Sequence, residues 1–430
     1  MGLGLRALRG FSSLEIIDRL GLRALSERAL FEGTKGGFKA AGAASRTFAS
    51  ASKLGKPERQ RPRSTTGLFD LTPDEDQQML VEAVTALAGD FRPAAVQADT
   101  ACAAPPELLA SANEMGVATL GVPEALGGFV EERSAVTSVL VASAMAHGDM
   151  GLAIAALAPG AVATAIGLWG TPEQQARYLP AFTEETPVCA ALTMLEPQPL
   201  FDPWALSTTA KASGDGFVLD GTKALVPRGA EAELFVVAAN LESRGPSLFL
   251  VESGTQGVSV EAEPAMGVRA AATATVRFDG VKLDADALLG DASPEVYAEC
   301  VHRARIAWCA VSVGCAQAVL DYVIPYVNER TAFGEPISNR QAVAFMVSDI
   351  GIELEGMRLT TLRAASRADM GKEFARESAL ARVLCARKGM DIGSNGVQLL
   401  GGHGYIKEHP VERWYRDLRA AGVMEGALLV

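Results

Sequence analysis

Residues Gln398 to Arg419 read QLLGGHGYIKEHPVERWYRDLR. An apolar helical pattern ends there at Gly401 and Gly402, and Gly404 follows before a charged and aromatic run. Glycine has no Cβ atom, so this backbone can come close to a ligand or to another chain. A turn that only ends a helix is the alternative interpretation.

A second unusual stretch, ERTAFGEPISNRQAVAF, runs from Glu329 to Phe345. It predicts a helix that ends near Arg330, a Phe-Gly-x-Pro-Ile turn, and a new helix that Gln341 opens. An arginine beside a helix N-terminus is typical of an anion clamp, because both favour negative charge. A surface salt bridge is the alternative for Arg330.

The chain of 430 residues, 49% hydrophobic and 21% charged, is long enough for two or three packed units. Residues 1–65 carry a charge of +8 within a net charge of −12, which leaves −20 for the body. An acidic body argues against nucleic acid as the main partner. The six cysteines form no CxxC pair and the four histidines are scattered. We therefore predict buried thiols and no metal site.

The periodicity divides the chain into four parts. Residues 1–67 form a basic amphipathic arm with a linker, 68–186 a helical unit, 187–292 an antiparallel β unit, and 293–430 a helical bundle. A helix is expected to start at Thr72-Pro73-Asp74-Glu75, with Thr72 as its cap. The last unit should hold long helices near 295–330, 339–370 and 373–400. No GxGxxG motif follows a predicted strand, which excludes a doubly wound nucleotide-binding fold. The sequence contains no run of 18 apolar residues, so no membrane span is expected.

The basic arm at residues 1–65 has three interpretations. It resembles an organellar transit peptide in its Arg and Ser content, although it contains several acids. It could instead lie on an anionic membrane surface, or pack on its own protein or a sister subunit. We expect a cytoplasmic protein of the bacterial type, with peripheral membrane contact through this arm as one variant, or a mitochondrial matrix protein if the arm is a transit peptide.

Both motifs and the α, β, α order resemble the acyl-CoA dehydrogenase family over residues 68–430. ERTAFGEPISNRQAV is similar to the family's ERxxFGxPIxxxQAV, and QLLGGHGYIKEHPVERWYRD to its QxxGGxGYxxExPVERxYRD. The resemblance implies an α+β multidomain fold with an N-terminal helical domain, a middle antiparallel β-barrel or sandwich domain and a C-terminal four-helix bundle. It also implies an FAD-dependent oxidoreductase of fatty acid and lipid metabolism that removes two hydrogens from an acyl-CoA thioester.

The resemblance assigns residues to the cofactor and to partners. The cofactor-binding positions are Arg330, Phe333, Gln341, Gln398, Gly401, Gly402 and Gly426. Because the family makes several of these contacts across a subunit interface, a homodimer or homotetramer is implied. An electron-transfer flavoprotein is the implied electron acceptor.

The final stretch, GVMEGALLV (residues 422–430), contains the candidate base. By itself Glu425 could be a solvated tail charge. In the family the base follows Arg-Asp at a fixed interval, and from Arg416-Asp417 that interval reaches Glu425. Some relatives place the base just before the CoA-contacting arginine, which matches Arg305; the residue there is Ala304, which cannot take a proton. A carboxylate can remove the weakly acidic proton beside a thioester in a dry, hydrogen-bonding site.

The middle unit departs from the family pattern at positions that usually contact flavin or substrate. Hydroxyl or tryptophan side chains are replaced by Leu195, Phe201, Leu225, Pro227 and Ala427. Each change removes a hydrogen bond or a ring contact, unless Thr193 substitutes through a change of register. Two alternatives to the dehydrogenase therefore remain at this point: a non-catalytic or partner subunit that binds flavin weakly, and an acyl-CoA oxidase.

Overall fold

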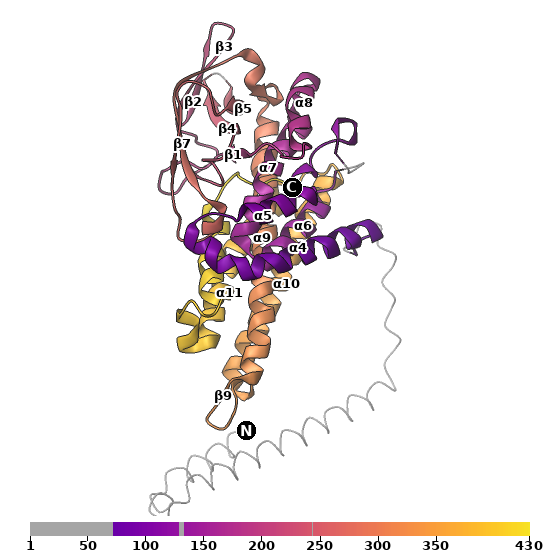
Figure 1. The fold of residues 1–430 in the computed structure, drawn as a ribbon. Coiled ribbons are helices and arrows are strands. Elements are labelled where there is room, and N and C mark those ends of the chain that lie inside the picture. The colour runs from indigo at the N-terminus through magenta and orange to yellow at the C-terminus, as the bar shows by residue number, and fades with distance from the viewer. Residues whose placement is uncertain (1–71, 129–132, 243) are drawn as a thin grey trace, which may run out of the picture. The chain divides into compact units, whose positions relative to one another are not determined.

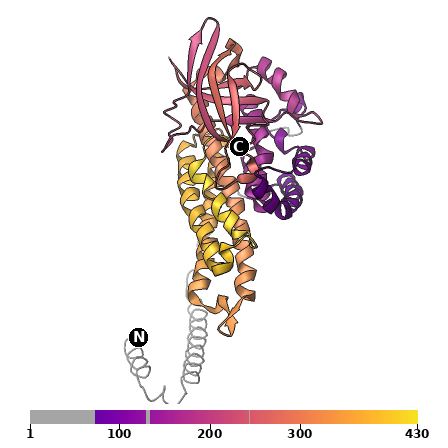
Figure 2. The same ribbon diagram turned by 60° about the vertical axis from the view of Figure 1, so that its left-hand side comes forward.

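The computed structural model describes residues 72–128, 133–242 and 244–430. The predicted arm at residues 1–67, with its three interpretations, lies outside the described residues. Figures 1 and 2 show the described chain as a set of helices, a β-sheet and a second set of long helices, in the order predicted.

The first part of the described chain is helical. Its elements are α4 (Glu75–Ala101), α5 (Pro106–Glu114), η2 (Val117–Thr119), η3 (Glu124–Leu126), α6 (Ala135–Gly148), α7 (Met150–Trp169), α8 (Pro172–Tyr178) and η4 (Leu179–Phe182). The predicted helix start is correct to within a few residues, but its cap is Asp74 rather than Thr72. The Asp74 side chain accepts from the N–H of Gln77 at 2.8 Å, and the Gln77 side chain accepts from the N–H of Asp74 at 3.2 Å. Two exposed N–H groups of the first turn are thereby satisfied reciprocally.

Two helices, α7 and α9 (Pro294–Glu329), are long and apolar enough by composition to cross a membrane. The sequence-based expectation of no such stretch was therefore too strict. In both helices, 78% of the apolar 18-residue window is buried inside the protein. A buried core helix has this character, so the two helices are weak indicators of a membrane span.

The middle part of the chain forms one eight-stranded sheet. Its strands are β1 (Ala190–Thr193), β2 (Thr209–Ser213), β3 (Gly216–Val226), β4 (Leu234–Leu241), β5 (Gly245–Glu252), β6 (Val258–Ala262), β7 (Ala274–Leu283) and β8 (Leu288–Leu289), with η5 (Arg269–Ala271), η6 (Ala285–Ala287) and η7 (Gly290–Ala292) between them. The order is β6-β7-β3-β2-β4-β5-β8, and β1 pairs with β4. Most pairings are antiparallel as expected, but β4 pairs in parallel with both β1 and β2, so the sheet is mixed. These two parallel pairings join strands distant in sequence, which local periodicity does not reveal.

The last part consists of long helices, as predicted. It contains α9, β9 (Thr331–Ala332), β10 (Glu335–Pro336), η8 (Ile337–Asn339), α10 (Gln341–Asp369), α11 (Ala375–Leu400), η9 (Gly401–Tyr405), α12 (Val411–Asp417) and α13 (Ala420–Val423). The three long helices α9, α10 and α11 pack together, the short α12 and α13 pack on α11, and α6 packs on α9 and α10. The largest apolar core joins these helices to α4 and α7, so the first and last parts share one interior.

Candidate active site

Glu425 lies on a short segment held between the sheet and the bundle. Its side chain is 6% exposed. Gly426 forms a β-bridge with Thr193 at the end of β1, and the N–H of Ala427 donates to the oxygen of Leu192 at 3.0 Å. On the other side, Trp308 of α9 donates to the oxygen of Gly426 at 2.8 Å. Glu425 is therefore a fixed, buried carboxylate, and the interpretation as a solvated tail charge is wrong for this structure.

Two arginines hold the Glu425 carboxylate. Arg305 of α9 donates from Nε to both oxygens at 3.1 Å and from Nη2 to Oε1 at 2.8 Å. Arg382 of α11 donates from Nη2 to Oε1 at 3.2 Å. The Arg305 side chain thus meets the candidate base directly. Arg382 was missed in the sequence because it stands alone in an ordinary amphipathic helix, and no local pattern marks it.

A pocket of about 690 Å³ opens beside Glu425. It is lined by Leu195, Glu196, Pro197, Gln198, Pro199, Leu200, Phe201, Ala224, Leu225, Glu263, Arg382, Gly422, Val423 and Glu425. The substituted positions Leu195, Phe201 and Leu225 therefore do face the candidate site. Pro227 is buried and is not part of this lining.

The pocket wall has polar contacts of its own, made by Glu263. Glu263 accepts from the backbone N–H of Leu225 at 2.7 Å and from the Thr275 hydroxyl at 2.8 Å. Leu225 has φ of 50°, in the left-handed region, so this strand end is bent at the pocket. Thr193 does not substitute, because it is 1% exposed and its hydroxyl donates to the oxygen of Val236 at 3.2 Å.

A buried ion pair reaches this wall through Glu196. Lys223 donates to Glu196 at 2.8 Å and to the oxygen of Met194 at 3.1 Å. Glu196 also accepts from the N–H groups of Ser207 and Thr208. Burial lowers the pKa of Lys223 to about 8 against the attraction of Glu196. Burial by itself would raise the pKa of Glu196. The charge of Lys223 and the hydrogen bonds from Lys223 and the two backbone N–H groups together outweigh burial, so the pKa of Glu196 is lowered.

The predicted residues of the two motifs lie at the other end of α9. Arg330 caps α9 and precedes β9, which Figure 1 shows at the end of the bundle remote from the sheet. Twenty-five residues of helix separate Arg305 from Arg330, or about 37 Å at 1.5 Å per residue. The predicted positions there are exposed: Arg330, Phe333, Gln341, Gln398, Gly401 and Gly402. In a single chain these residues do not meet Glu425.

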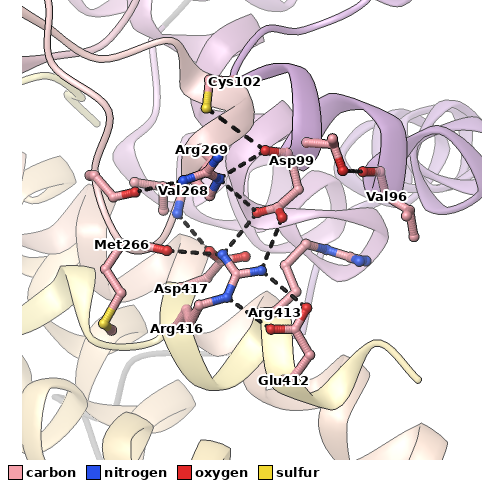
Figure 3. A network of polar contacts seen from close by, with 12 residues as sticks. Val96, Asp99, Cys102, Met266, Val268, Arg269, Glu412, Arg413, Arg416 and Asp417 are labelled. Carbon is pink, nitrogen blue, oxygen red and sulfur yellow. Dashed lines mark hydrogen bonds and ion pairs between the residues drawn. The ribbon is translucent and has the colours of Figure 1, made fainter. Parts of the chain in front are cut away.

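A network of charges fixes α12, which the short helix α13 separates from the candidate base (Figure 3). Arg416 donates to both oxygens of Asp99 in α4 at 2.9 and 3.1 Å and also to Glu412. The backbone N–H of Val268 donates to Asp417 at 2.6 Å. These contacts join α12 to the first helical part and to the loop after β6, and they explain how the turn before Glu425 is placed.

Two carboxyl groups at α12, those of Asp149 and Asp417, are deeply buried. Arg413 donates to Asp149 at 2.9 Å, and Asp149 also caps α7. Burial, followed by the charge of Asp149, raises the pKa of Asp417 above its usual range. Burial likewise raises the pKa of Asp149, against the attraction of Arg413. The network therefore fixes α12 although burial disfavours the charged forms of these two carboxyl groups.

The described residues show five buried cysteines and one partly buried cysteine, all free, as predicted from the absence of CxxC pairs. Among these same residues no group of three or more His, Cys, Asp or Glu side chains is arranged to hold a metal ion.

Comparison with known proteins decides the family. The acyl-CoA dehydrogenase N-terminal domain matches residues 74–186, the middle domain 189–281 and the C-terminal domain 295–428. The chain belongs to the acyl-CoA dehydrogenase family. It is therefore an enzyme of the flavin-dependent oxidoreductase class, as the resemblance implied.

Three similar proteins illustrate this family relationship. The bovine mitochondrial short-chain specific acyl-CoA dehydrogenase is 34% identical over 342 residues, which are 78% of this chain and 82% of the relative. The structure of butyryl-CoA dehydrogenase from Megasphaera elsdenii is 26% identical, with a TM-score of 0.77 over 83% of this chain and 96% of that one. A structure described as the electron transferring flavoprotein of Acidaminococcus fermentans is 28% identical, with a TM-score of 0.76 over 83% of this chain and 96% of that one.

Proposed function

We propose that this acyl-CoA dehydrogenase family member oxidises an acyl-CoA thioester to the 2-enoyl-CoA, with Glu425 as the base. The observation that carries the proposal is a buried carboxylate fixed at the wall of a pocket of about 690 Å³. Arg305 and the backbone around Gly426 hold that carboxylate in one place. A positioned base needs such restraint to work within hydrogen-bond reach of its proton.

The hydrogen bonds distinguish the two carboxylate oxygens of Glu425. Oε1 accepts from Arg305 Nε and Nη2 and from Arg382 Nη2. Among the described residues, Oε2 accepts from Arg305 Nε alone, at 3.1 Å. Each carboxylate oxygen has two lone pairs. Three donors share those of Oε1, whereas one donor leaves a lone pair of Oε2 free to take a proton. We assign Oε2 as the atom that takes the α-proton.

The pocket offers apolar surface against which the flat ring system of FAD could pack. Leu195, Pro197, Phe201 and Leu225 give it apolar walls, and the remaining lining includes the polar side chains of Glu196, Gln198, Glu263, Arg382 and Glu425. FAD, when bound, supplies the acceptor for the hydride that leaves the β-carbon. The residues present would hold the ring by packing more than by hydroxyl groups.

A second copy of the chain would supply the remaining cofactor contacts. Arg330 is exposed and about 37 Å from the chain's own Arg305 by the length of α9, and Gly401 and Gly402 are exposed as well. Phe345, Ile352 and Leu359 recur every seven residues on α10 and are exposed, with Ile352 at 68%. Such an apolar stripe indicates a helix face that packs on another helix. We propose a homo-oligomer that pairs this face and completes the cofactor site.

An electron-transfer flavoprotein is the proposed electron acceptor. A chain similar to this one occurs in a structure whose description concerns the electron transferring flavoprotein of Acidaminococcus fermentans, and this supports the choice. Butyryl-CoA is the first substrate to test, because similar proteins are named as short-chain and butyryl-CoA dehydrogenases.

A non-catalytic partner subunit is the second candidate. The specific observation in its favour is that Leu195, Phe201 and Leu225 face the pocket where hydroxyl and indole groups were expected. Such walls would weaken the polar contacts to a flavin.

Purification distinguishes the two candidates. The dehydrogenase predicts a yellow protein whose flavin spectrum bleaches when butyryl-CoA is added without oxygen. A colourless protein that takes up no FAD, alone or co-expressed with another family member, would contradict the proposal and favour the partner subunit.

A further inference from the structure

We infer that Arg382 is a positioning residue for the proton transfer: it holds Glu425 before the reaction and balances the charge that moves to the substrate during it. The inference rests on the proposed function of Glu425.

The burial of Arg382 calls for an explanation. Arg305 alone already makes three hydrogen bonds to Glu425 and neutralises its charge. Arg382 adds a second guanidinium whose side chain is only 12% exposed. Burial lowers the pKa of Arg382 despite the charge of Glu425, which shows that its desolvation outweighs that attraction. A buried positive charge beyond the one that pairs Glu425 is costly unless it serves another negative charge.

Arg382 uses one of its two Nη groups on Glu425. Its Nη2 donates to Glu425 Oε1, but its Nη1 is buried and donates to no described residue. Arg382 also lines the pocket that Glu425 faces. Because Nη1 is shielded from solvent, Arg382 acts through its hydrogen bond to Glu425 and through its charge beside the pocket.

Proton transfer to Glu425 produces a new negative charge on the substrate. The bond between hydrogen and the α-carbon breaks, and the proton forms a bond to Glu425 Oε2. The electron pair remains on the substrate, and its negative charge lies largely on the thioester oxygen. Glu425 is then neutral, so the positive charges of Arg305 and Arg382 are no longer offset by it, and Arg382 lies at the pocket that holds the new anion. Donors fixed before the reaction stabilise such a developing charge most effectively.

Three variants test this role. Arg382→Met removes the charge and the donors, and Arg382→Lys keeps the charge with a single nitrogen. Arg387→Met changes an exposed arginine five residues further along α11 and serves as the matched control. The direct readout is exchange of the α-hydrogens of butyryl-CoA with solvent deuterium, measured anaerobically by mass spectrometry. Steady-state kcat and KM, the pH profile of kcat/KM and the melting temperature accompany it.

We expect Arg382→Met to slow α-exchange by about tenfold to a hundredfold, the effect of losing a charged hydrogen bond. The fall should lie mainly in kcat, and the acidic limb of the kcat/KM profile should move to higher pH because one positive charge is gone. Arg382→Lys should recover much of the rate, and Arg387→Met should match the wild type.

Wild-type exchange in Arg382→Met, with an unchanged pH profile, would overturn the inference while leaving the proposed function intact. A loss that follows the melting temperature equally in Arg382→Met and Arg382→Lys would also overturn it, since it would show a structural role only. Absence of α-exchange in the wild-type protein would instead contradict the proposed function itself.

Discussion

The indole Nε1 of Trp308 donates a hydrogen bond of 2.8 Å to the carbonyl oxygen of Gly426, the residue that follows Glu425. Trp308 is fully buried and lies on α9 one turn after Arg305, so one helix supplies both the cation that pairs Glu425 and the donor that fixes the backbone next to Glu425. The position of Glu425 relative to Arg305 is therefore set by the geometry of α9.

Removal of the indole donor should loosen the base. In Trp308→Phe the oxygen of Gly426 loses its partner in a buried place, and we expect a loss of about 1–3 kcal/mol in the free energy of unfolding. The value of kcat should fall more than KM changes, because the base becomes less well positioned. Trp169→Phe, at a tryptophan that donates to Glu299 at 3.3 Å, is the control and should leave kcat unchanged. Equal kcat values in the two variants would contradict this role of Trp308.

The buried Lys223–Glu196 pair should be sensitive to the loss of either partner. In Lys223→Met, Glu196 keeps two backbone donors but loses its cation, and we expect a loss of about 3–5 kcal/mol in urea unfolding at pH 7. The double variant Lys223→Met/Glu196→Gln should recover most of that loss. A double variant no more stable than Lys223→Met would show that the pair does not act as a unit.

The pH dependence of stability tests the same lysine. Its folded pKa of about 8 lies below the usual value near 10.4, so the folded state disfavours the proton. This contribution to stability is present above the usual pKa and is lost as the pH falls through about 8. The wild type should therefore gain stability from pH 8 to pH 10 relative to the double variant. A difference that is constant over this range would contradict a lowered pKa.

Sequence patterns predicted the helical and β parts and the long helices of the bundle, because apolar periodicity and turn residues are local properties. The resemblance to the acyl-CoA dehydrogenase family singled out Glu425, through its interval from Arg416-Asp417. Arg382 and the Lys223–Glu196 pair were not marked, because each acquires its contact from a residue far away in the chain. The parallel pairing of β4 with β1 escaped prediction for the same reason.

The carboxyl group of Asp417 should destabilise the folded protein as it ionises. Burial and the charge of Asp149 raise its pKa, so the contribution of this group to stability is greatest in acid and is lost as the pH rises through the raised pKa. Asp417→Asn keeps an oxygen to accept from Val268 and carries no charge. Measured by urea unfolding from pH 4 to pH 8, this variant should gain stability relative to the wild type as the pH rises. Parallel curves for the two proteins would contradict the raised pKa.

The proposed subunit interface predicts that a charge on α10 dissociates the assembly. Ile352→Asp places a carboxylate in the middle of the exposed apolar stripe, where pairing would bury it without a partner. Light scattering after gel filtration should show a smaller species, with weaker FAD retention because Arg330 of the second copy is lost. Arg387→Asp, on an exposed part of α11, controls for the added charge. An unchanged mass and full FAD content in Ile352→Asp would move the interface elsewhere.

The most direct test of Glu425 as the base is anaerobic flavin reduction by butyryl-CoA in the wild type and in Glu425→Gln. The amide keeps the size of the side chain but cannot take the α-proton. We predict that Glu425→Gln binds FAD as well as the wild type does and that its flavin reduction is slower by a factor of about 100 or more. Bleaching at the wild-type rate in Glu425→Gln would contradict the account and assign the proton to another group.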